Sequence, residues 1–320
     1  MEDLLSQAIH RHDQNMLILA HESAGFTYQF LGRYVEAKAH LIAAKELYDV
    51  HRHHSPILDY TQDPGVSARI VLARTLWVLG EVDQVDALMQ EAISRARELE
   101  HPFTLAFALA TSGWIYAGMG DADRILALSD EAMALSTTHS FQVTLAWATF
   151  FHSWALAHKG HQESLSRLVK VISAAQTIGA NLNSTYMLTL LAGIYLRQHR
   201  IDEGLSALAE AEKLVHSLEE RCWEAEIFRL RGELLLERSE QSISAAEQCF
   251  SGAMKIAQDQ HAKMLELRAA TSMARLLKKQ NQLDRARRIL SSVRSKFADQ
   301  CVNPDVIEAQ ALLDRLTMTS

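Results

Sequence analysis

Apolar and polar residues alternate in long blocks along the chain, and the block from Pro102 to Ala132 shows this pattern most clearly. Small and apolar residues run from Pro102 to Met119, where Gly120 and Asp121 interrupt them. The apolar positions after this break are Ile125, Leu126, Leu128, Ala132 and Met133. Proline suits the first position of a helix, because the N–H that it lacks has no partner there. The block predicts two helices joined by a tight turn, both too apolar to stand without neighbours.

The same break recurs at a nearly fixed interval of 40 residues. The marks of this interval are Gly80, Gly120, Gly160, Arg200, Glu240 and, one residue late, Asn281. An earlier unit around Gly32 is displaced by eight residues, which an inserted loop from Val50 to Val66 explains. A period kept over most of a chain is typical of a solenoid built from helical repeats.

The pattern predicts an all-α fold, a right-handed α-solenoid of about seven helix pairs with a 40-residue period and a C-terminal capping helix. First helices are expected at about 14–31, 65–79, 102–119, 142–159, 183–198, 222–238 and 262–279. Second helices are expected at about 34–50, 82–99, 122–137, 162–177, 202–217, 242–259 and 283–298. The cap is expected at 304–317 and carries Ile307, Ala309, Leu312, Leu313 and Leu316. We expect one domain over 1–320, with repeats at about 14–50, 64–100, 102–140, 142–180, 182–220, 222–260 and 262–300.

The residues around the turns fit the tetratricopeptide repeat (TPR). That repeat has a small residue seven before the turn, a bulky one four before it, and alanine-like residues five and twelve after it. The residues at these places around Gly120 are Gly113, Tyr116, Ile125 and Ala132. The small residue is expected to let the helices of a pair approach closely, and Gly25 and Gly193 occupy the same place in other repeats. Because the period exceeds the usual 34 residues, each helix is expected to be about one turn longer.

Several stretches resemble one bacterial protein group over nearly the whole chain. They are QDPGV (62–66), HPFTLAFAL (101–109), TLAWATFFHSWALAHKG (144–160), RCWEAEIFRLRGELLL (221–236) and LELRAATSMARLL (265–277). They are similar to the C-terminal tetratricopeptide region of large predicted ATPases, many of which also carry a class III adenylate cyclase domain. The resemblance implies a module that regulates or scaffolds a signalling ATPase or cyclase. No GxxxxGK[ST] phosphate loop is present, so the expected relative is the solenoid alone.

The composition limits the cellular compartment and the kinds of partner that we expect. Hydrophobic residues make up 48% of the chain, and no run of eighteen apolar residues is present to span a membrane. The three cysteines are widely spaced without a CxxC motif, which favours a reduced cytoplasm over a disulfide-rich setting. A formal net charge of −7 argues against general nucleic-acid affinity. We expect no cofactor, no nucleic-acid partner and no membrane partner.

Candidate chemistry is sparse. His51, His53 and His54 lie in the inserted loop near Asp59 and Asp63, but they lack a regular metal-ligand spacing. Solvated loop histidines are the preferred interpretation, and a metal or substrate site in this loop is the alternative that an enzyme would require. We expect no catalytic residues.

A concave groove lined by the first helices is the main candidate site. Counting from the turns selects Arg74, Trp77, Trp114, Trp147, Phe150, Trp154, His158 and Arg197 as groove residues. Tryptophan and arginine often anchor partners, because each combines a large contact area with a polar group. The alternative is that these rings pack between repeats.

Positive charge gathers near the C-terminus. Residues 262–300 hold ten lysines and arginines against three acidic residues. The expected basic patch is Lys278, Lys279, Arg285, Arg287 and Arg288. A solvated surface is the ordinary interpretation. The alternative is a docking face for an acidic partner or for a second copy of the chain.

These observations predict a scaffold or regulatory module that binds a protein or peptide in its concave groove. The alternative function is a sensor of a small ligand or signalling peptide. An enzyme is the third hypothesis.

Overall fold

The structure is a computed structural model that describes residues 2–11, 13–49, 62–177 and 182–318, and their regular structure is entirely helical. Two compact units are present. One comprises Met1–Trp77 and Asp83–Gly179, and the other comprises Val78–Val82 and Ala180–Ser320. We call them the N-terminal and C-terminal units and describe each by itself. The expectation of a single domain over 1–320 stays a prediction.

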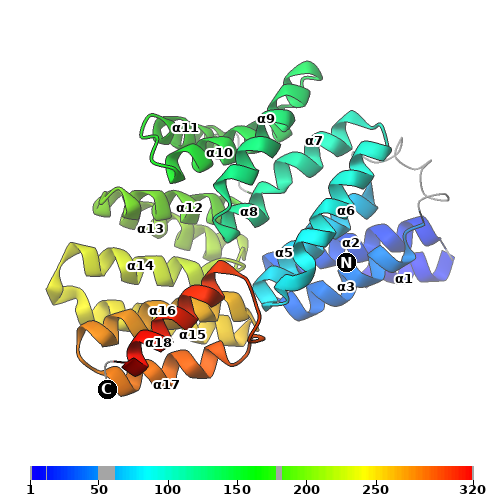
Figure 1. The fold of residues 1–320 in the computed structure, drawn as a ribbon. Helices are drawn as coiled ribbons and strands as arrows, with labels where there is room; N and C mark the ends of the chain where they lie inside the picture. The colour runs from blue at the N-terminus through cyan, green and yellow to red at the C-terminus, as the bar shows by residue number, and fades with distance from the viewer. Residues whose placement is uncertain (1, 12, 50–61, 178–181, 319–320) are drawn as a thin grey trace. The chain divides into compact units, whose positions relative to one another are not determined.

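The helices as far as residue 177 follow the expected alternation (Figure 1). They are α1 (Glu2–Arg11), α2 (Gln14–Phe30), α3 (Tyr34–Leu47), α5 (Pro64–Leu79), η2 (Val82–Gln84), α6 (Val85–Glu98), α7 (Pro102–Thr111), α8 (Gly113–Met119), α9 (Ala122–Thr138), α10 (Gln142–His158) and α11 (Ser164–Thr177). Helix α2 packs against α3, α9 packs against both α7 and α10, and α10 packs against α11. Each helix thus buries its apolar side against its neighbours in sequence.

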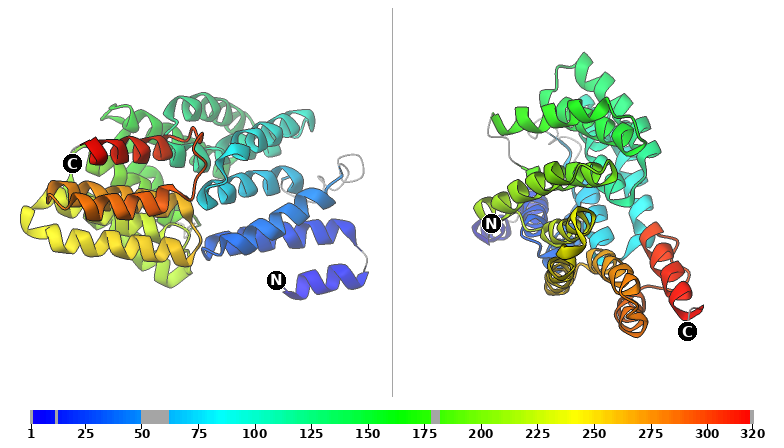
Figure 2. Two further views of the ribbon diagram at one scale, coloured as in Figure 1. Left: turned by 60° about the horizontal axis from the view of Figure 1, so that its bottom comes forward. Right: turned by 90° about the vertical axis from the view of Figure 1, so that its left-hand side faces the viewer.

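The remaining helices form a second series of hairpins, and their neighbouring helices lie side by side (Figure 2). They are α12 (Ser184–Arg197), α13 (Ile201–Leu218), α14 (Glu224–Arg238), η3 (Glu240–Ser242), α15 (Ile243–Asp259), α16 (Lys263–Lys279), α17 (Leu283–Arg294) and α18 (Pro304–Met318). Helix α18 packs on both α16 and α17.

The predicted all-α solenoid is confirmed, with three local differences. Helix α1 was not predicted. The first helix of the third pair is divided into α7 and α8 at Ser112, whose hydroxyl donates a hydrogen bond to the Leu109 carbonyl at 2.6 Å. The capping helix is at its predicted place, but Ile307 is 54% exposed and Val306 is buried instead. The buried face of the cap is therefore one position away from the prediction at that end.

Local chemistry explains where the helices begin and end. The Asp121 carboxylate accepts a hydrogen bond from the backbone N–H of Arg124 and so caps the start of α9. Gly120 ends α8 in the left-handed conformation, with φ of 73°, which glycine adopts without strain. In the fifth pair the left-handed residue is His199, with φ of 54°, and Arg200 begins the next helix. The turn residue of the fifth pair is therefore His199, one residue before the predicted Arg200.

Small residues seven positions before the turn do not all have the predicted role. A Cβ at Gly25 would overlap Leu41 of α3, so this glycine does bring the two helices of its pair together. A Cβ at Gly113 would overlap the ring of Phe151, which belongs to α10 of the next pair. At Gly193 an added Cβ would meet no atom within 4 Å. The expectation of close approach within a pair is therefore right for Gly25 but wrong for Gly113 and Gly193.

Three helices of the C-terminal unit share a largely buried ionic network. Glu226 of α14 accepts hydrogen bonds from Arg229 at 2.7 and 2.9 Å and lies 3.8 Å from Arg268 of α16. Arg268 in turn donates to Asp305 of α18 at 2.8 Å. Burial raises the pKa of Glu226, but the two guanidinium groups outweigh it and hold that pKa below its usual value. The network joins α14, α16 and α18 by charge as well as by apolar packing.

No helix in the described part of the chain is long and apolar enough to cross a membrane.

Candidate functional site

The residues predicted to line the groove are mostly packed inside the protein. Trp77 and Phe150 are 1% and 0% exposed, and Trp114 and Trp154 are 4% exposed. An added Cβ at Gly118 would stand 3.3 Å from the Trp77 ring, so this indole fills space beside α8. In this structure Trp77 and Phe150 offer no surface that a partner could contact. The predicted partner-binding role of the set stays a prediction.

Arg74 lies among aromatic rings. Its guanidinium carbon is 5.9 Å from the centroid of the Phe30 ring and 5.7 Å from that of Trp114. Arg74 itself is 6% exposed. A cation held near ring faces is stabilised by their quadrupoles, and the effect grows as water is excluded. The arrangement joins α2, α5 and α8 and therefore has at least a structural role.

Partly exposed aromatic side chains lie on α7, on α10 and directly before α10, and we call four of them the aromatic row. They are Phe103, Phe107, Phe141 and Trp147. Phe103 meets Phe141 edge to face with centroids 5.0 Å apart, and Phe107 meets Trp147 in the same way at 6.2 Å. Trp147 also packs against a core cluster that includes Leu109. The row is thus anchored in the core on one side and reaches solvent on the other.

Sequence reasoning found Trp147 but missed the three phenylalanines of the row. Phe107 and Trp147 are 40 residues apart, which is one repeat, so the period itself placed them at equivalent positions. Phe103 and Phe107 are separated by four residues and so share one face of α7. Counting from the turn could have found both phenylalanines, but only tertiary contact shows that their rings meet those of α10.

His158 and Arg197 lie at the ends of their first helices. The ring of His158 is tilted against that of Trp154 with centroids 4.7 Å apart, and His158 is partly exposed. Arg197 is exposed in the last turn of α12, where a cation is favourable beside the unpaired carbonyls. Their assignment to a partner site stays a prediction.

The predicted basic patch is partly neutralised by contacts within the C-terminal unit. Arg285 pairs with Glu247 of α15 at 2.6 Å. Arg287 donates to the carbonyl of Leu316 in α18 at 2.9 Å and lies 3.2 Å from Asp284. Lys279 and Arg288 are exposed and Lys278 is partly exposed. Two of the five cations therefore join helices together, and a docking role for the patch stays a prediction.

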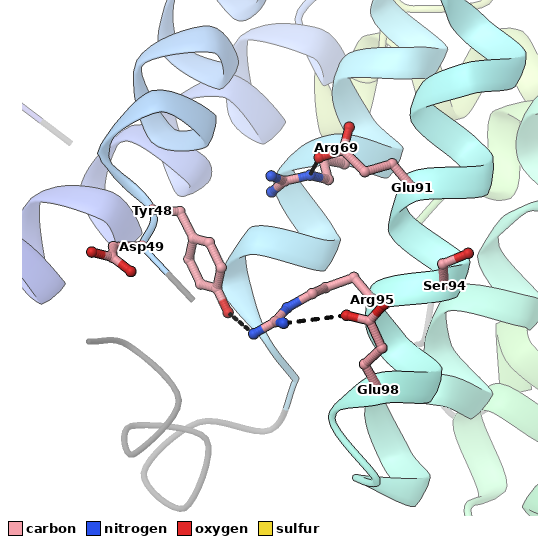
Figure 3. A pocket seen from close by; sticks show the side chains of 7 residues that line it. All are labelled: Tyr48, Asp49, Arg69, Glu91, Ser94, Arg95 and Glu98. Atoms are coloured by element: carbon pink, nitrogen blue, oxygen red, sulfur yellow. Dashed lines mark hydrogen bonds and ion pairs between the residues drawn. The ribbon is translucent and has the colours of Figure 1, made fainter. Parts of the chain in front are cut away.

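An open cleft of about 520 Å³ lies between the end of α3, α5 and α6 in the N-terminal unit (Figure 3). We call it the Tyr48 cleft. Its lining residues are Tyr48, Asp49, Arg69, Glu91, Ser94, Arg95 and Glu98. Sequence reasoning did not predict this cleft. Four of its members share one face of α6, but the others come from α5 and from the end of α3, which are distant in sequence.

Tyr48 is held firmly in the wall of the cleft. Its hydroxyl donates a hydrogen bond of 2.6 Å to the carboxylate of Asp63, which is fully buried. The ring lies against Gly65, where an added Cβ would stand 2.8 Å from three ring atoms. Burial first, and then the Asp63 carboxylate, raise the pKa of the Tyr48 phenol, so the hydroxyl stays protonated and remains a donor.

Asp63 also ties the cleft to the next repeat. Its carboxylate accepts the backbone N–H of Val66 at 2.8 Å, and its own N–H donates to the Thr104 hydroxyl of α7 at 3.1 Å. Thr104 contacts the ring nitrogen of His101 at 2.8 Å. In the alternative that places a metal in the inserted loop, Asp63 was one of two acidic residues near the histidines. In the structure its carboxylate has a structural role at the start of α5.

Two arginines approach the Tyr48 ring. The guanidinium carbons of Arg69 and Arg95 are 5.8 and 5.9 Å from the ring centroid. Arg69 is well paired, because Nε lies 2.7 Å from Glu91 and Nη1 lies 2.9 Å from the carbonyl of Gly65. Arg95 contacts the Tyr48 hydroxyl and Glu98 (Figure 3). Both contacts are longer, at 3.5 Å.

The structure gives little support to a metal centre among the residues that it describes. Within these residues no three histidine, cysteine, aspartate or glutamate side chains come together as metal ligands would. His51, His53, His54 and Asp59 lie outside the described residues, so the loop hypothesis is not addressed there.

Comparisons with solved structures show a similar fold at low sequence identity. NprR in complex with its cognate peptide NprX matches with a TM-score of 0.58 and 12% identity, over 90% of this chain and 82% of that chain. Yeast Tom70 matches with a TM-score of 0.51 and 12% identity, over 99% of this chain and 58% of that chain.

A third similar structure is a Signal Transduction ATPase with Numerous Domains (STAND) that has a tetratricopeptide repeat sensor, PH0952 from Pyrococcus horikoshii. It matches with a TM-score of 0.50 and 13% identity, over 96% of this chain and 50% of that chain. This chain thus spans little more than half the length of Tom70 and half that of the STAND protein. No protein-family model matches the chain, and no curated protein matches its sequence. At these identities the likeness establishes the fold alone, a helical-repeat fold shared with a protein that carries a tetratricopeptide repeat sensor.

Proposed function

We propose that the chain is a binding module that holds a protein or peptide segment against the aromatic row of α7 and α10. The observation that carries the proposal is the row itself. Phe103, Phe107, Phe141 and Trp147 are partly exposed while their rings contact one another across the two helices. Aromatic side chains anchored in this way present contact area at low cost in side-chain entropy, which is typical of binding hot spots.

A peptide is the proposed kind of partner. The solved structure of NprR holds its cognate peptide NprX, and its fold resembles this chain over most of both lengths. The fold likeness supports the class of ligand and does not indicate which residues contact it. The aromatic row is proposed from the contacts within this chain alone.

The proposed setting is bacterial signalling linked to an ATPase or adenylate cyclase. Two observations support it: the resemblance of five sequence stretches to the tetratricopeptide region of predicted ATPases, and the fold likeness to a STAND protein with a tetratricopeptide repeat sensor. The setting is testable from the neighbouring genes, where an ATPase or cyclase gene beside this one would support the link.

A peptide-display selection on the full chain provides the test of binding. We expect selected peptides to lose affinity about tenfold or more when Phe103 and Phe107 are both replaced by alanine, because aromatic rings that a bound partner covers contribute strongly to affinity. Isothermal titration of one selected peptide measures the change. Replacing Trp114 or Trp154 is a poorer test, because both indoles are buried and their removal would leave cavities.

Phe228→Ala serves as the matched control. Phe228 is also a partly exposed aromatic on a first helix, α14, but it belongs to the C-terminal unit and packs near Gly252 of α15. Peptide affinity should be unchanged in this variant. Selected peptides that bind the Phe103/Phe107 double variant as tightly as the natural chain, with equal helicity by circular dichroism, would contradict the aromatic row as the site.

A further inference from the structure

Arg95 in the Tyr48 cleft is a largely buried cation without a close acceptor among the residues that the structure describes. Its side chain is 17% exposed, and its buried Nε atom has no hydrogen-bond partner in the described part of the chain. The two contacts made by its Nη atoms are both at 3.5 Å, the outer limit for a hydrogen bond. Arg69 has a similar exposure of 13% in the same cleft, yet it has partners at 2.7 and 2.9 Å. The contrast singles out Arg95.

The acidic neighbour of Arg95 is weakly held. Glu98 is three residues further along α6, and its side chain is 67% exposed. An exposed pair of this kind contributes little to stability, because solvent screens it and ordering both side chains costs entropy. A ligand that brings its own acceptor can therefore displace Glu98 from Arg95 while Tyr48 keeps its bond to Asp63 and Arg69 keeps its pair with Glu91.

The opposite wall of the cleft is already in place before a ligand arrives. Tyr48 is fixed by the fully buried Asp63 and by the close packing of Gly65. Arg69 is fixed by Glu91 on α6 and by the Gly65 carbonyl on α5. Few side chains would have to lose conformational freedom when a ligand binds. This low entropic cost is the usual reason why preformed sites bind tightly.

The charged side chains of the cleft indicate which anionic group of a ligand would bind there. Guanidinium groups match the geometry of both carboxylates and phosphates. The cleft, however, already has three acidic side chains, Asp49, Glu91 and Glu98, against its two arginines. A doubly charged phosphate would meet more repulsion there than a singly charged carboxylate. A volume of about 520 Å³ is typical of ligand sites and leaves room for the group that bears the carboxylate.

We propose that the Tyr48 cleft binds a carboxylate-bearing ligand through Arg95, with the carboxylate taking the place of Glu98. The carboxylate can belong to a peptide C-terminus or to a small organic acid, and the test separates these two sources. The inference does not depend on the aromatic row, since it uses α3, α5 and α6 and other residues. Either proposal can fail while the other stands.

Nuclear magnetic resonance of the full chain tests the proposal through the Nε–Hε signal of Arg95. The probes are 3-phenylpropionate, N-acetyl-trialanine with a free C-terminus, the same tripeptide as its C-terminal amide, and inorganic phosphate. We expect saturable shifts with at least one carboxylate and none with the amide or phosphate. Binding of the tripeptide acid alone identifies a peptide C-terminus, and binding of 3-phenylpropionate identifies a small acid as sufficient.

Variants on α6 separate binding from folding. Arg95→Gln should abolish the response, and Glu98→Gln should tighten binding about threefold, because it removes the competing carboxylate. Arg97→Gln is the matched control: Arg97 is on the same helix but is engaged by Glu131 of α9 at 2.6 and 2.7 Å. The gain from Glu98→Gln is a readout that a merely structural Arg95 would not produce.

Three results would overturn the proposal. One is the absence of saturable binding of both carboxylates to the natural chain and to Glu98→Gln. Another is equal binding of the tripeptide acid and its amide, since the carboxylate would then not be recognised. The third is an equal loss of binding in Arg97→Gln and Arg95→Gln, which would indicate a general effect of charge on α6.

Discussion

At the scale of single residues, two histidines form an unusual pair in the first helix hairpin. The Nδ1 atoms of His21 on α2 and His40 on α3 are 3.0 Å apart, and the two rings are partly buried. One nitrogen must donate its proton to the lone pair of the other, so the contact requires that at least one ring is neutral. Burial lowers the pKa of both rings, and the charge of His40 lowers that of His21 further.

The histidine pair should make stability fall as the solution is acidified. Because the folded pKa values lie below the ordinary value of 6.5, the unfolded chain binds more protons in this range. The contribution of the pair is complete above that value and is lost as the pH falls toward the folded pKa values. Urea unfolding at a series of pH values measures the slope. In His40→Asn the slope between about pH 7 and pH 5 should be shallower, and an equal slope would contradict the assignment.

Two glycines at equivalent repeat positions should respond oppositely to alanine. Gly113→Ala would place a methyl group onto the Phe151 ring, and we expect a loss of about 1–3 kcal/mol in the free energy of unfolding. Gly193→Ala meets no atom within 4 Å inside α12, so the gain in helix propensity should stabilise by about 0.5–1 kcal/mol. Chemical denaturation measures both values. The interpretation of close packing fails if the two changes have the same sign.

At the scale of helices, the ionic network of α14, α16 and α18 is largely buried and joins three helices of the C-terminal unit. Glu226, Arg229 and Arg268 are all largely shielded from water, and the carboxylate lies between the two guanidiniums. Without Glu226 the two buried guanidinium groups would stay charged and would keep only their other acidic partners, Asp305 for Arg268 and Glu233 for Arg229. The loss of a charged partner from such a buried network costs more than the pair contributes when intact.

Glu226→Gln should therefore destabilise the protein by about 3 kcal/mol, measured by urea unfolding near neutral pH. Since the folded pKa of Glu226 is below its usual value, the contribution is present above about pH 4.5 and lost as the pH falls through the folded pKa. Glu203→Gln is the matched control, because Glu203 pairs with Arg200 at the same spacing on an exposed surface. A similar loss in both variants would indicate a general charge effect.

In the capping helix, the sequence predicted the position of the helix in the chain better than it predicted which of its sides is buried. Periodicity and Pro304 predicted a helix over 304–317, and α18 spans Pro304–Met318. The buried residues are Val306, Ala309, Leu312, Leu313 and Leu316. Val306 and Ile307 are both apolar and adjacent, so the pattern could not choose between them. The contacts of α18 with α16 and α17 make that choice.

At the scale of the whole molecule, the stability of each repeat is expected to depend on its packing against the neighbouring repeats. Within each unit the helices pack mainly against those next to them in sequence. In arrays of this type each repeat depends on its neighbours and is only indirectly affected by distant ones. A local change should therefore have a graded effect along the chain.

Deletion of residues 304–320 tests this behaviour. The deletion removes the five buried apolar side chains of α18 and the partners of Arg268 and Arg275. Amide hydrogen exchange should become faster in α16 and α17, less so in α14 and α15, and stay unchanged in α2 and α3. Uniformly faster exchange along the whole chain would show that the molecule unfolds as one cooperative unit.

For the candidate sites, the sequence showed which residue types lie on the first helices, but it did not predict how exposed their side chains are. It selected Trp114, Trp147 and Trp154 correctly as residues of first helices, but it could not tell that Trp114 and Trp154 are almost completely buried. A helix of the solenoid has neighbours on more than one side, and hydrophobic periodicity does not show which side reaches solvent. The aromatic row and the Tyr48 cleft both depend on contacts between helices.

The sequence by itself determined the helical repeat, its 40-residue period, most helix boundaries and the place of the cap, because turns, caps and apolar spacing are local properties. Only the tertiary structure decided which side of each helix is buried, that Gly113 contacts the following pair, and that Arg95 lacks a close acceptor within the described ranges. Those properties arise from side chains that lie tens of residues apart in the chain. Their contacts are set by packing in three dimensions, which spacing along one helix does not contain.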